Sequence, residues 1–446
     1  MNINLGKDNI SKLLFRLSFP AIMAQLINAL YNIIDRIYIG NIEGQLALTG
    51  VGLCFPIIII IMAFAGLIAQ GAAPIAAIYM GKNDNERAEN IMGNSFILLI
   101  LSGVILTIFF QIFKEPILYM VGASNNTINY ALDYLEIYIW GTLPVLLTLG
   151  MNMFISTQGF SKISMNTVLI GAILNIILDF IFIYIFSMGV KGAAYATIIS
   201  QTISFLWVMF FLFGNQTKLK LKKEYFKLKK DIVIPAFALG LSPFFMMATE
   251  SIINIVLNTS LQRTGGDIAV GTMTIISSIM QFVLLPIQGL GQGAQPILSY
   301  NFGANNFERV KETFNKFFII SIIMTSIFCI FILLGAPTIV KIFNKDEILI
   351  NFAVTPVRIY FCMIVAMGIQ CSCQQTFLAT GQSKVSLFLA LLRKIILLAP
   401  LAVVFSYIWG YNGVFVAEPV SDVIAATITF IMFMKNRKYI FEGLKK

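Results

Sequence analysis

The chain repeats part of itself about half its length later. Gln70-Gly71-Ala72-Ala73-Pro74-Ile75 returns as Gln292-Gly293-Ala294-Gln295-Pro296-Ile297, at an offset of 222 residues, and Gly81 returns as Gly303 at the same offset. Pro20 maps onto Pro243 at an offset of 223. A drift of one residue over such a span, in a chain of 446 residues, predicts two homologous halves in the same order.

The composition is that of a membrane protein. The chain is 58% hydrophobic and 12% charged, whereas soluble domains carry about 25% charged residues. Apolar runs of about 20 residues, each long enough to cross a bilayer as a helix, begin near Leu13, Val51, Ile91, Ala131, Ile163, Gly192, Ile232, Ala269, Phe314, Ile350, Val385 and Gly413. We therefore predict an all-α integral membrane protein with twelve transmembrane helices in two six-helix lobes.

The repeat and the loop charges predict the domains and the orientation. Residues 1–213 form the N-lobe, 214–231 a basic linker and 232–446 the C-lobe. Parallel repeats of this kind are related by a pseudo-twofold axis along the membrane normal and are typical of transporters. Lysines and arginines concentrate in the linker, in the tail and in loops on the same side, which predicts that both termini are cytoplasmic in a multi-pass cell (inner) membrane protein.

The net charge of +10 raises the question of nucleic acid. Seven linker lysines carry much of it: Lys218, Lys220, Lys222, Lys223, Lys227, Lys229 and Lys230. Anionic lipid of the inner leaflet attracts such a segment, so we predict the lipid bilayer as a partner and no nucleic acid. The five cysteines all lie in predicted spans and histidine is absent, which disfavours disulfides and metal knuckles.

Several motifs of catalysis are missing from the sequence. It contains no Gly-x-x-x-x-Gly-Lys-[Ser/Thr] loop for a nucleotide phosphate, no Gly-x-Ser-x-Gly elbow and no histidine. No cofactor is expected. What remains is a secondary transporter driven by an ion gradient, with an intramembrane enzyme that uses paired carboxylates as one alternative.

Two carboxylates stand out inside the spans of the first half. Asp35 follows Tyr31 by four residues and Asp179 follows Asn175 by four, so each pair shares a helical face. Both helices are predicted to run outward, and Thr197 reaches the same depth from the opposite direction. Oxygen donors of this kind suit a hard cation, or a proton shared between desolvated acids. The plainer alternatives are that Asp35 pairs with Arg36 and that Asp179 belongs to a structural polar cluster.

The second half differs from the first at these positions. Position 35 maps onto Asn258 and position 179 onto Leu401 or Ala402, so ion coupling is predicted in the N-lobe only. In the seventh span Glu250 is predicted to contact substrate or a cation, and Asn258 to contact substrate. Glu418 and Asp422 are predicted to form structural ion pairs with Arg393 or Lys394. Pro20 bends the first span and is either a hinge or a static kink.

With these residues in view, the chain resembles the multidrug and toxic compound extrusion (MATE) family of cation-coupled antiporters. The resemblance rests on Leu17-Ser18-Phe19-Pro20, Tyr31-Asn32-Ile33-Ile34-Asp35 and Leu174-Asn175-Ile176-Ile177-Leu178-Asp179. It implies an N-lobe cation site at Asp35, Asn175, Asp179 and Thr197, a surrounding network at Tyr31 and Asn152, and a bending proline at Pro20. A sodium-coupled branch adds a Glu in the seventh span, which Glu250 resembles, and an Asp in the tenth, where 350–378 has no acid.

The expected activity is export of amphipathic, often cationic, small organic compounds in exchange for H+ or Na+, by a monomeric protein. A lipid-linked saccharide flippase of related architecture is the other alternative. Such a protein would need a basic cavity for a pyrophosphate, and arginines are scarce inside these spans.

Overall fold

The computed structural model describes residues 3–343 and 346–444, and this part of the chain is helical with no strand. The helices in order are α1 (Ile10–Ile42), α2 (Gly44–Gly81), α3 (Asn85–Met120), α4 (Ile128–Trp140), α5 (Thr142–Thr157), α6 (Ser161–Asp179), the π-helix η1 (Phe180–Ile185), α7 (Gly189–Phe213), the 3₁₀ turn η2 (Lys223–Tyr225), α8 (Lys230–Gly303), α9 (Phe307–Phe343), α10 (Glu347–Phe361), α11 (Val365–Ala379), α12 (Ser383–Leu391), the π-helix η3 (Leu392–Leu398) and α13 (Ala399–Glu442).

Long apolar helices account for the predicted spans. Among the described residues, eight helices are long and apolar enough to cross a membrane, or up to ten if the bent pairs α4–α5 and α10–α11 each count as one span. The 74 residues of α8 would measure about 110 Å if straight. They break instead at Gly266, where φ is 63°, and residues 383–442 break likewise at Gly410, where φ is 61°. Each of these two stretches therefore supplies two spans, which gives the twelve predicted from the sequence.

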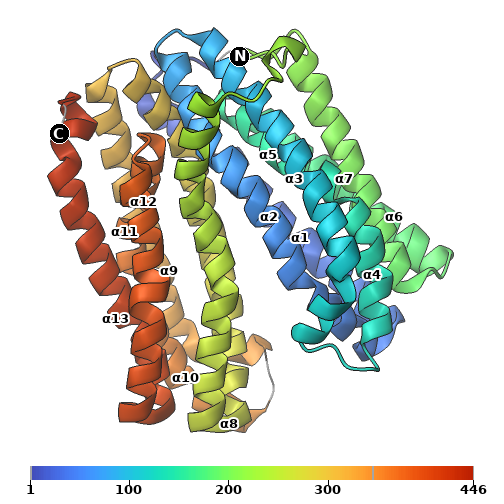
Figure 1. Ribbon diagram of the computed structural model, residues 1–446. Helices are drawn as coiled ribbons and strands as arrows, with labels where there is room; N and C mark the ends of the chain where they lie inside the picture. Colours follow the sequence, from blue (N-terminus) through green and yellow to red (C-terminus); the bar gives the residue numbers. More distant parts are fainter. Residues whose placement is uncertain (1–2, 344–345, 445–446) are drawn as a thin grey trace.

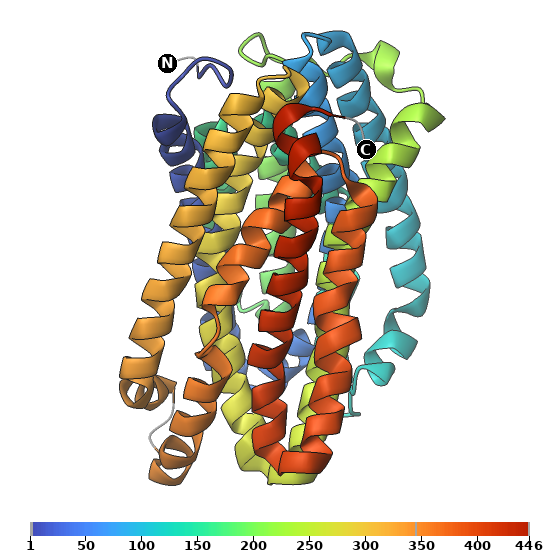
Figure 2. The ribbon, with the colours of Figure 1, turned by 90° about the vertical axis from the view of Figure 1, so that its left-hand side faces the viewer.

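The spans form two lobes side by side. Helices α1–α7 build one lobe, and α8–α13 build the other (Figure 1). Figure 2 views the molecule from the side of the second lobe and shows its helices running the full height. The segment 214–229 and both chain ends lie at the same end of the bundle, which we call the linker end. The lobes meet at the linker end and diverge toward the opposite end.

Helix α1 contacts both lobes. Its first turns pack on the C-lobe: Leu13 and Leu17 are buried in one cluster with Leu290 and Phe314, and the Ser18 hydroxyl donates to the Leu290 carbonyl at 3.3 Å. The later turns of α1 pack instead against α6 and α7 of the N-lobe. The backbone of α1 is still against α8 at Ile22, where a Cβ on Gly289 would lie 2.6 Å from the Ile22 Cα, so Pro20 lies within the part of α1 that contacts the C-lobe.

Glycines of the repeated motif bring the lobes together at the linker end. A Cβ on Gly81 of α2 would overlap the backbone carbonyl of Tyr300 in α8, and a Cβ on its repeat mate Gly303 would overlap the carbonyl of Ile78 in α2. A Cβ on Gly71 of α2 would likewise overlap the backbone carbonyl of Ala236 in α8. Because only hydrogen fits at these crossings, the backbones of α2 and α8 touch directly. The repeated motif at 70–81 and 292–303 therefore forms part of the surface at which the two halves meet.

The basic linker is anchored to the protein rather than lying free. The buried side chain of Gln158 accepts hydrogen bonds from the backbone nitrogens of Lys218 and Leu219, at 2.7 and 2.8 Å, and from the Thr217 hydroxyl at 2.8 Å. Lys222 pairs with Glu89 at 2.7 Å. The Lys218 ammonium donates to carbonyls, and burial lowers its pKa. Some of the linker lysines that the composition predicts to contact lipid, Lys218 and Lys222, thus bind the N-lobe instead.

Replacing Gln158 should release this segment. Gln158→Leu removes the acceptor of the Lys218 and Leu219 backbone N–H groups. The Leu219 N–H is buried, and leaving such a group unpaired costs about 1–3 kcal/mol, so we expect a lower melting temperature and faster tryptic cleavage after the linker lysines. Thr217→Ala leaves both nitrogens bonded to Gln158 and serves as the matched control, with a smaller effect expected. Equal protease resistance of Gln158→Leu and wild type would contradict the anchoring role.

Candidate cation site and substrate cleft

The centre of the N-lobe site is Asp179. It is the last residue of α6, is fully buried, and is followed at once by the π-helix η1. A π-helix changes the direction of the side chains that follow it and is frequent at functional sites. Neither carboxylate oxygen of Asp179 has a hydrogen-bond partner among the residues that the structure describes. An ionised carboxylate that is buried without a hydrogen-bond partner costs free energy, unless a cation or a proton binds to it.

One turn earlier on α6, Asn175 connects the site to α7. Its Nδ2 donates to the Thr197 hydroxyl at 3.3 Å, and that hydroxyl donates to the Ala193 carbonyl at 3.0 Å. These two bonds fix the amide orientation, so that Oδ1 of Asn175 is the acceptor left over, and it too has no partner within the described part of the chain. The buried Tyr134 of α4 adds a phenol close to Thr197. Tyr134 was not predicted from the sequence, although its stacked partner Tyr138 follows it by four residues.

The second carboxylate comes from α1. Asp35 is half-buried, its Oδ1 is buried without a partner among the described residues, and it is close enough to Asp179 to interact with it electrostatically. Tyr31 lies within reach of both acids. Arg36 does not form an ion pair with Asp35: its guanidinium lies over the ring of Phe55, 4.3 Å from the centroid. Arg36 therefore acts on Asp35 through its nearby charge and not through a direct ion pair.

The site gathers buried oxygen acceptors that no neighbouring donor binds in the described part of the chain. Asp35, Asp179 and Asn175 together present four buried oxygens with no partner among the described residues. Carboxylate and amide oxygens are the ligands of hard cations, and protonation would equally convert an acid into the missing donor. The residues present thus fit either Na+ or H+.

Asn152 lies apart from this group. Its Nδ2 donates to the Ser164 carbonyl at 3.2 Å, and Ser164 precedes Asn175 by eleven residues of helix, or about 16 Å. The resemblance groups Asn152 with the cation network. The structure places it nearer the linker end, as its depth in the sequence indicates.

In the C-lobe the predicted ion pairs are present. Arg393, presented by the π-helix η3, donates to Asp422 at 2.6 Å and to Glu418 at 3.0 Å, which confirms the structural pairing predicted for these two acids. Glu250 has a partner that the sequence did not predict, since its carboxylate lies 3.4 Å from the Lys394 ammonium. The acid predicted to contact substrate or a cation is thus already paired within the protein.

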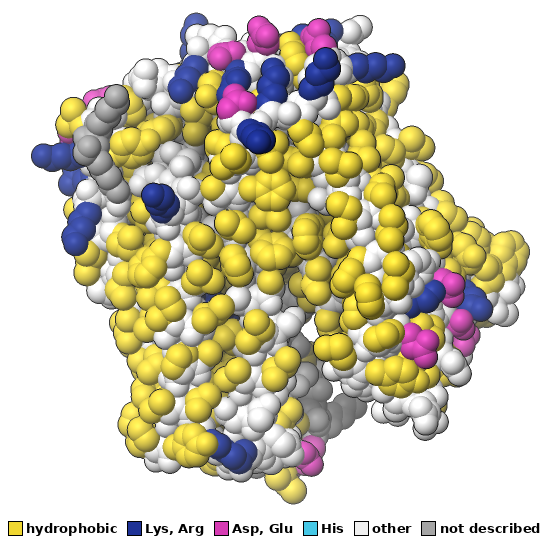
Figure 3. Space-filling view, viewed as in Figure 1, with side chains coloured by type: hydrophobic (Ala, Val, Ile, Leu, Met, Phe, Trp, Pro, Cys, Tyr) yellow, Lys and Arg dark blue, Asp and Glu magenta, His cyan; other side chains and the backbone are white. Residues whose placement is uncertain are grey.

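Glu250 and Asn258 lie where the lobes separate. Both are exposed on the first half of α8, two turns apart on one face. Phe244, six residues before Glu250, still contacts Phe64 of the N-lobe, with ring centroids 5.4 Å apart. The surface is hollowed between the lobes toward the end opposite the linker (Figure 3). The side chains of Glu250 and Asn258 are therefore accessible on the stretch of α8 beyond the Phe244–Phe64 contact, and their contact with substrate stays a prediction.

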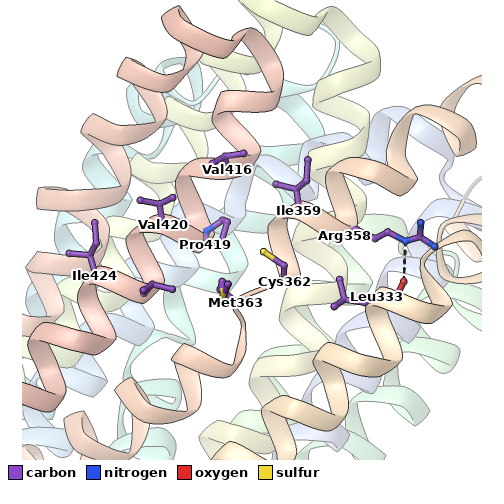
Figure 4. Close-up of a pocket in the computed structure, with 10 residues that line it drawn as sticks. Leu333, Arg358, Ile359, Cys362, Met363, Val416, Pro419, Val420 and Ile424 are labelled. Carbon is purple, nitrogen blue, oxygen red and sulfur yellow. Dashed lines mark hydrogen bonds between the residues drawn. The ribbon is translucent and has the colours of Figure 1, made fainter.

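A separate groove of about 640 Å³ opens on the C-lobe between α9, α10 and α13 (Figure 4). Its lining is apolar except for Arg358 at the rim. Pro337 has no N–H for the Leu333 carbonyl, and Arg358 Nε donates to that oxygen at 3.0 Å. This bond explains an arginine within the span, and the remaining lining suits acyl chains of the surrounding bilayer.

Comparison with known proteins agrees with this architecture. The MatE family model matches the chain twice, at residues 20–181 and 243–404. These two matches begin at Pro20 and Pro243, the pair that the internal repeat aligns.

Relatives match over nearly the whole chain. "Multidrug export protein MepA" of Staphylococcus haemolyticus is 27% identical over 434 residues, covering 97% of this chain and 95% of the relative, and that of Staphylococcus aureus (strain N315) is 26% identical over 431 residues, covering 96% and 95%. A MATE structure in the bent conformation superposes with a TM-score of 0.92 at 24% identity, covering 98% of this chain and 97% of the other. An outward-facing multidrug resistance MATE transporter gives 0.91 at 24% identity, covering 98% of each.

Proposed function

The chain belongs to the MatE family of transporters, and we propose that it is an antiporter that exports amphipathic organic cations in exchange for H+ or Na+. It is a transporter and not an enzyme. The observation that carries the proposal is the group of unpartnered buried oxygens of Asp35, Asp179 and Asn175. The names of the MepA relatives support multidrug compounds as the substrate class.

The orientation that fits this activity has the linker end in the cytoplasm. Lysines and arginines cluster there on the face shown in Figure 3, as the distribution of positive charge in membrane proteins favours. The space-filling view is hollowed between the lobes at the end opposite the linker (Figure 3), so in this orientation the cleft opens to the outside. We expect the protein to work as a monomer and to have no nucleic-acid partner.

The charges in the C-lobe favour the antiporter over a saccharide flippase. A flippase would need free cations in the cavity to bind a pyrophosphate. Arg393 is held by Glu418 and Asp422, and Lys394 faces Glu250. Because these acids neutralise both basic residues, the cleft suits a positively charged compound better than an anionic one.

Ion binding is coupled to helix α1. Two neighbouring carboxylates repel each other when both are ionised, and binding of H+ or Na+ at Asp35 and Asp179 removes that repulsion and favours close packing of α1 on α6. The ion can shift the two conformations only by its difference in affinity for them. The hydrogen bond from Ser18 in α1 to Leu290 of the C-lobe supports a coupling in which movement of the second part of α1 would be transmitted between the lobes.

The proposal is tested by transport in proteoliposomes with independently imposed pH and sodium gradients. Uptake or efflux of a fluorescent organic cation driven by one of the two gradients supports antiport and identifies the ion. Transport that proceeds unchanged without either gradient would contradict it.

Pro20→Ala tests whether the bend in α1 carries the coupling. Alanine restores a backbone N–H in mid-helix, so we expect a straighter α1 and a drug affinity that no longer changes with pH or sodium. Drug binding is measured at several pH values and sodium concentrations. Pro243→Ala, at the repeat position in α8, is the matched control and should keep ion sensitivity. Wild-type ion sensitivity in Pro20→Ala would make Pro20 a static kink.

A further inference from the structure

A network of five charges crosses the C-lobe beside the cleft. Arg393 contacts Asp422 and Glu418. Lys394 contacts Glu250 at 3.4 Å and reaches Glu418 at 3.9 Å. The network therefore joins the first half of α8, the π-helix η3 and α13, which are three different spans.

The network has room for one more positive charge. Its three acids face two bases, so it carries one net negative charge when every member is ionised. The side chain of Glu418 is only 2% exposed, yet its Oε2 has no hydrogen-bond partner in the described part of the chain. The Lys394 ammonium lies between the carboxylates of Glu250 and Glu418. A small displacement of the ammonium toward Glu418 would bring it into direct contact with that carboxylate.

Only one of the three acids in the network is exposed. The Glu250 side chain is 51% exposed, whereas those of Glu418 and Asp422 are nearly buried. Glu250 lies about 30 Å along the helix from Lys230 and about 24 Å from the break at Gly266, and hence near mid-span. A charge at that depth is costly unless it is paired. In this structure Lys394 supplies that pairing.

We propose that Lys394 is a built-in competitor for the cationic substrate: an organic cation entering the cleft takes its place on Glu250, and Lys394 transfers to Glu418. This inference rests on the proposed function and specifies how its substrate is recognised. Lys394 keeps Glu250 neutralised in the empty cleft and is itself neutralised by Glu418 when the substrate binds. Affinity then reflects an exchange of cations, so a neutral compound of similar size gains nothing at this position.

The N-lobe has no basic residues at the positions equivalent to Arg393 and Lys394. At the 222-residue offset that relates Ser161 to Ser383, Arg393 and Lys394 map onto Gly171 and Ala172. The two lobes have thus diverged in opposite directions, with unpartnered acids in the first and a base-filled network in the second. This division separates an ion site from a substrate site.

The test is equilibrium binding of tetraphenylphosphonium, with the neutral dye Nile red as the comparison, to purified full-length protein in nanodiscs. Lys394→Gln should tighten tetraphenylphosphonium binding about tenfold, because the competing charge is gone, and Glu250→Gln should weaken it by a similar factor. In the Glu250→Gln background, Lys394→Gln should have no further effect. Nile red binding should not change. Lys114→Gln, which removes a lysine paired with Glu136 in the N-lobe, is the matched control.

A purely structural ion pair gives a different pattern. Lys394→Gln would then lower the melting temperature and leave cation affinity equal or weaker, which would overturn the inference, as would equal tightening of Nile red. If the variant does not fold, ¹³C-dimethylated lysines of the wild type are followed by NMR, with Lys394 assigned from Lys394→Arg. Its signal should shift with tetraphenylphosphonium and not with Nile red; an unchanged signal overturns the proposal. Because binding needs no ion gradient, failure of antiport would leave this result standing, and the reverse holds too.

Discussion

Asp35→Asn and Asp179→Asn should each abolish gradient-driven efflux while the protein still folds and inserts. The amide keeps the shape of the carboxylate but can neither take up a proton nor supply a negative charge to a cation. Removing a charge inside the membrane does not raise the cost of insertion. Efflux of a fluorescent cation from proteoliposomes under an imposed pH or sodium gradient measures the effect, and size-exclusion chromatography checks the fold.

The matched control is Asn258→Ala. Asn258 stands at the repeat position of Asp35 and is exposed on α8, so its loss should alter substrate affinity and leave ion dependence unchanged. Full efflux in either aspartate variant would remove the N-lobe site from the mechanism. Loss of ion dependence in Asn258→Ala would mean that coupling is not confined to one lobe.

The N-lobe site could be predicted because local spacing and depth define it. Asp179 and Asn175 are four residues apart, so they share one face of the helix wherever it begins. The opposite directions of the two spans then place Thr197 at the same depth in the membrane. The Asn175–Thr197 hydrogen bond agrees with this prediction. The π-helix after Asp179 could not be predicted, since Phe180–Ile185 is an ordinary apolar run.

The C-lobe network shows what a single sequence leaves open. Glu418 and Asp422 could be paired with Arg393 because few bases lie inside the spans and the four-residue spacing aligns both acids. Glu250 was left without its partner because periodicity gives the face of a helix and not its neighbour. Lys394 lies next to Arg393 in sequence but turns to a different helix, α8, from the widened turn of η3.

The linker shows a second limit. Its composition indicates a basic loop at a membrane surface, and that description fits its exposed lysines. Its attachment depends on Gln158 and Glu89, which are single polar residues near helix ends with no recurring pattern. Such anchoring is set by tertiary contacts and becomes visible only when the helix ends are placed in space.

Gly303→Leu should shift the transporter out of the conformation that is closed at the linker end. The new Cβ overlaps the Ile78 backbone carbonyl, and a backbone atom cannot turn aside as a side chain can. Overpacking a well-packed core costs about 1–3 kcal/mol, and reversing a 99:1 population takes about 5.5 kcal/mol. We therefore expect a partial shift for Gly303→Leu or Gly81→Leu alone and nearly complete opening for the pair, with transport lost.

Spin labels at Lys82→Cys and Lys311→Cys, in a background without the native cysteines, report the separation of the lobes at the linker end by electron paramagnetic resonance. The distance distribution should move to longer values in each glycine variant. Gly52→Leu is the matched control on α2, because a Cβ there meets nothing within 4 Å. If Gly81→Leu and Gly303→Leu kept the wild-type distribution and full transport, the glycine crossings would be tolerant packing and not the contact that closes this end. Opening by the pair, with Gly52→Leu unchanged, would explain why the same glycines recur in both halves: each half supplies one side of a closure that transport must make and break.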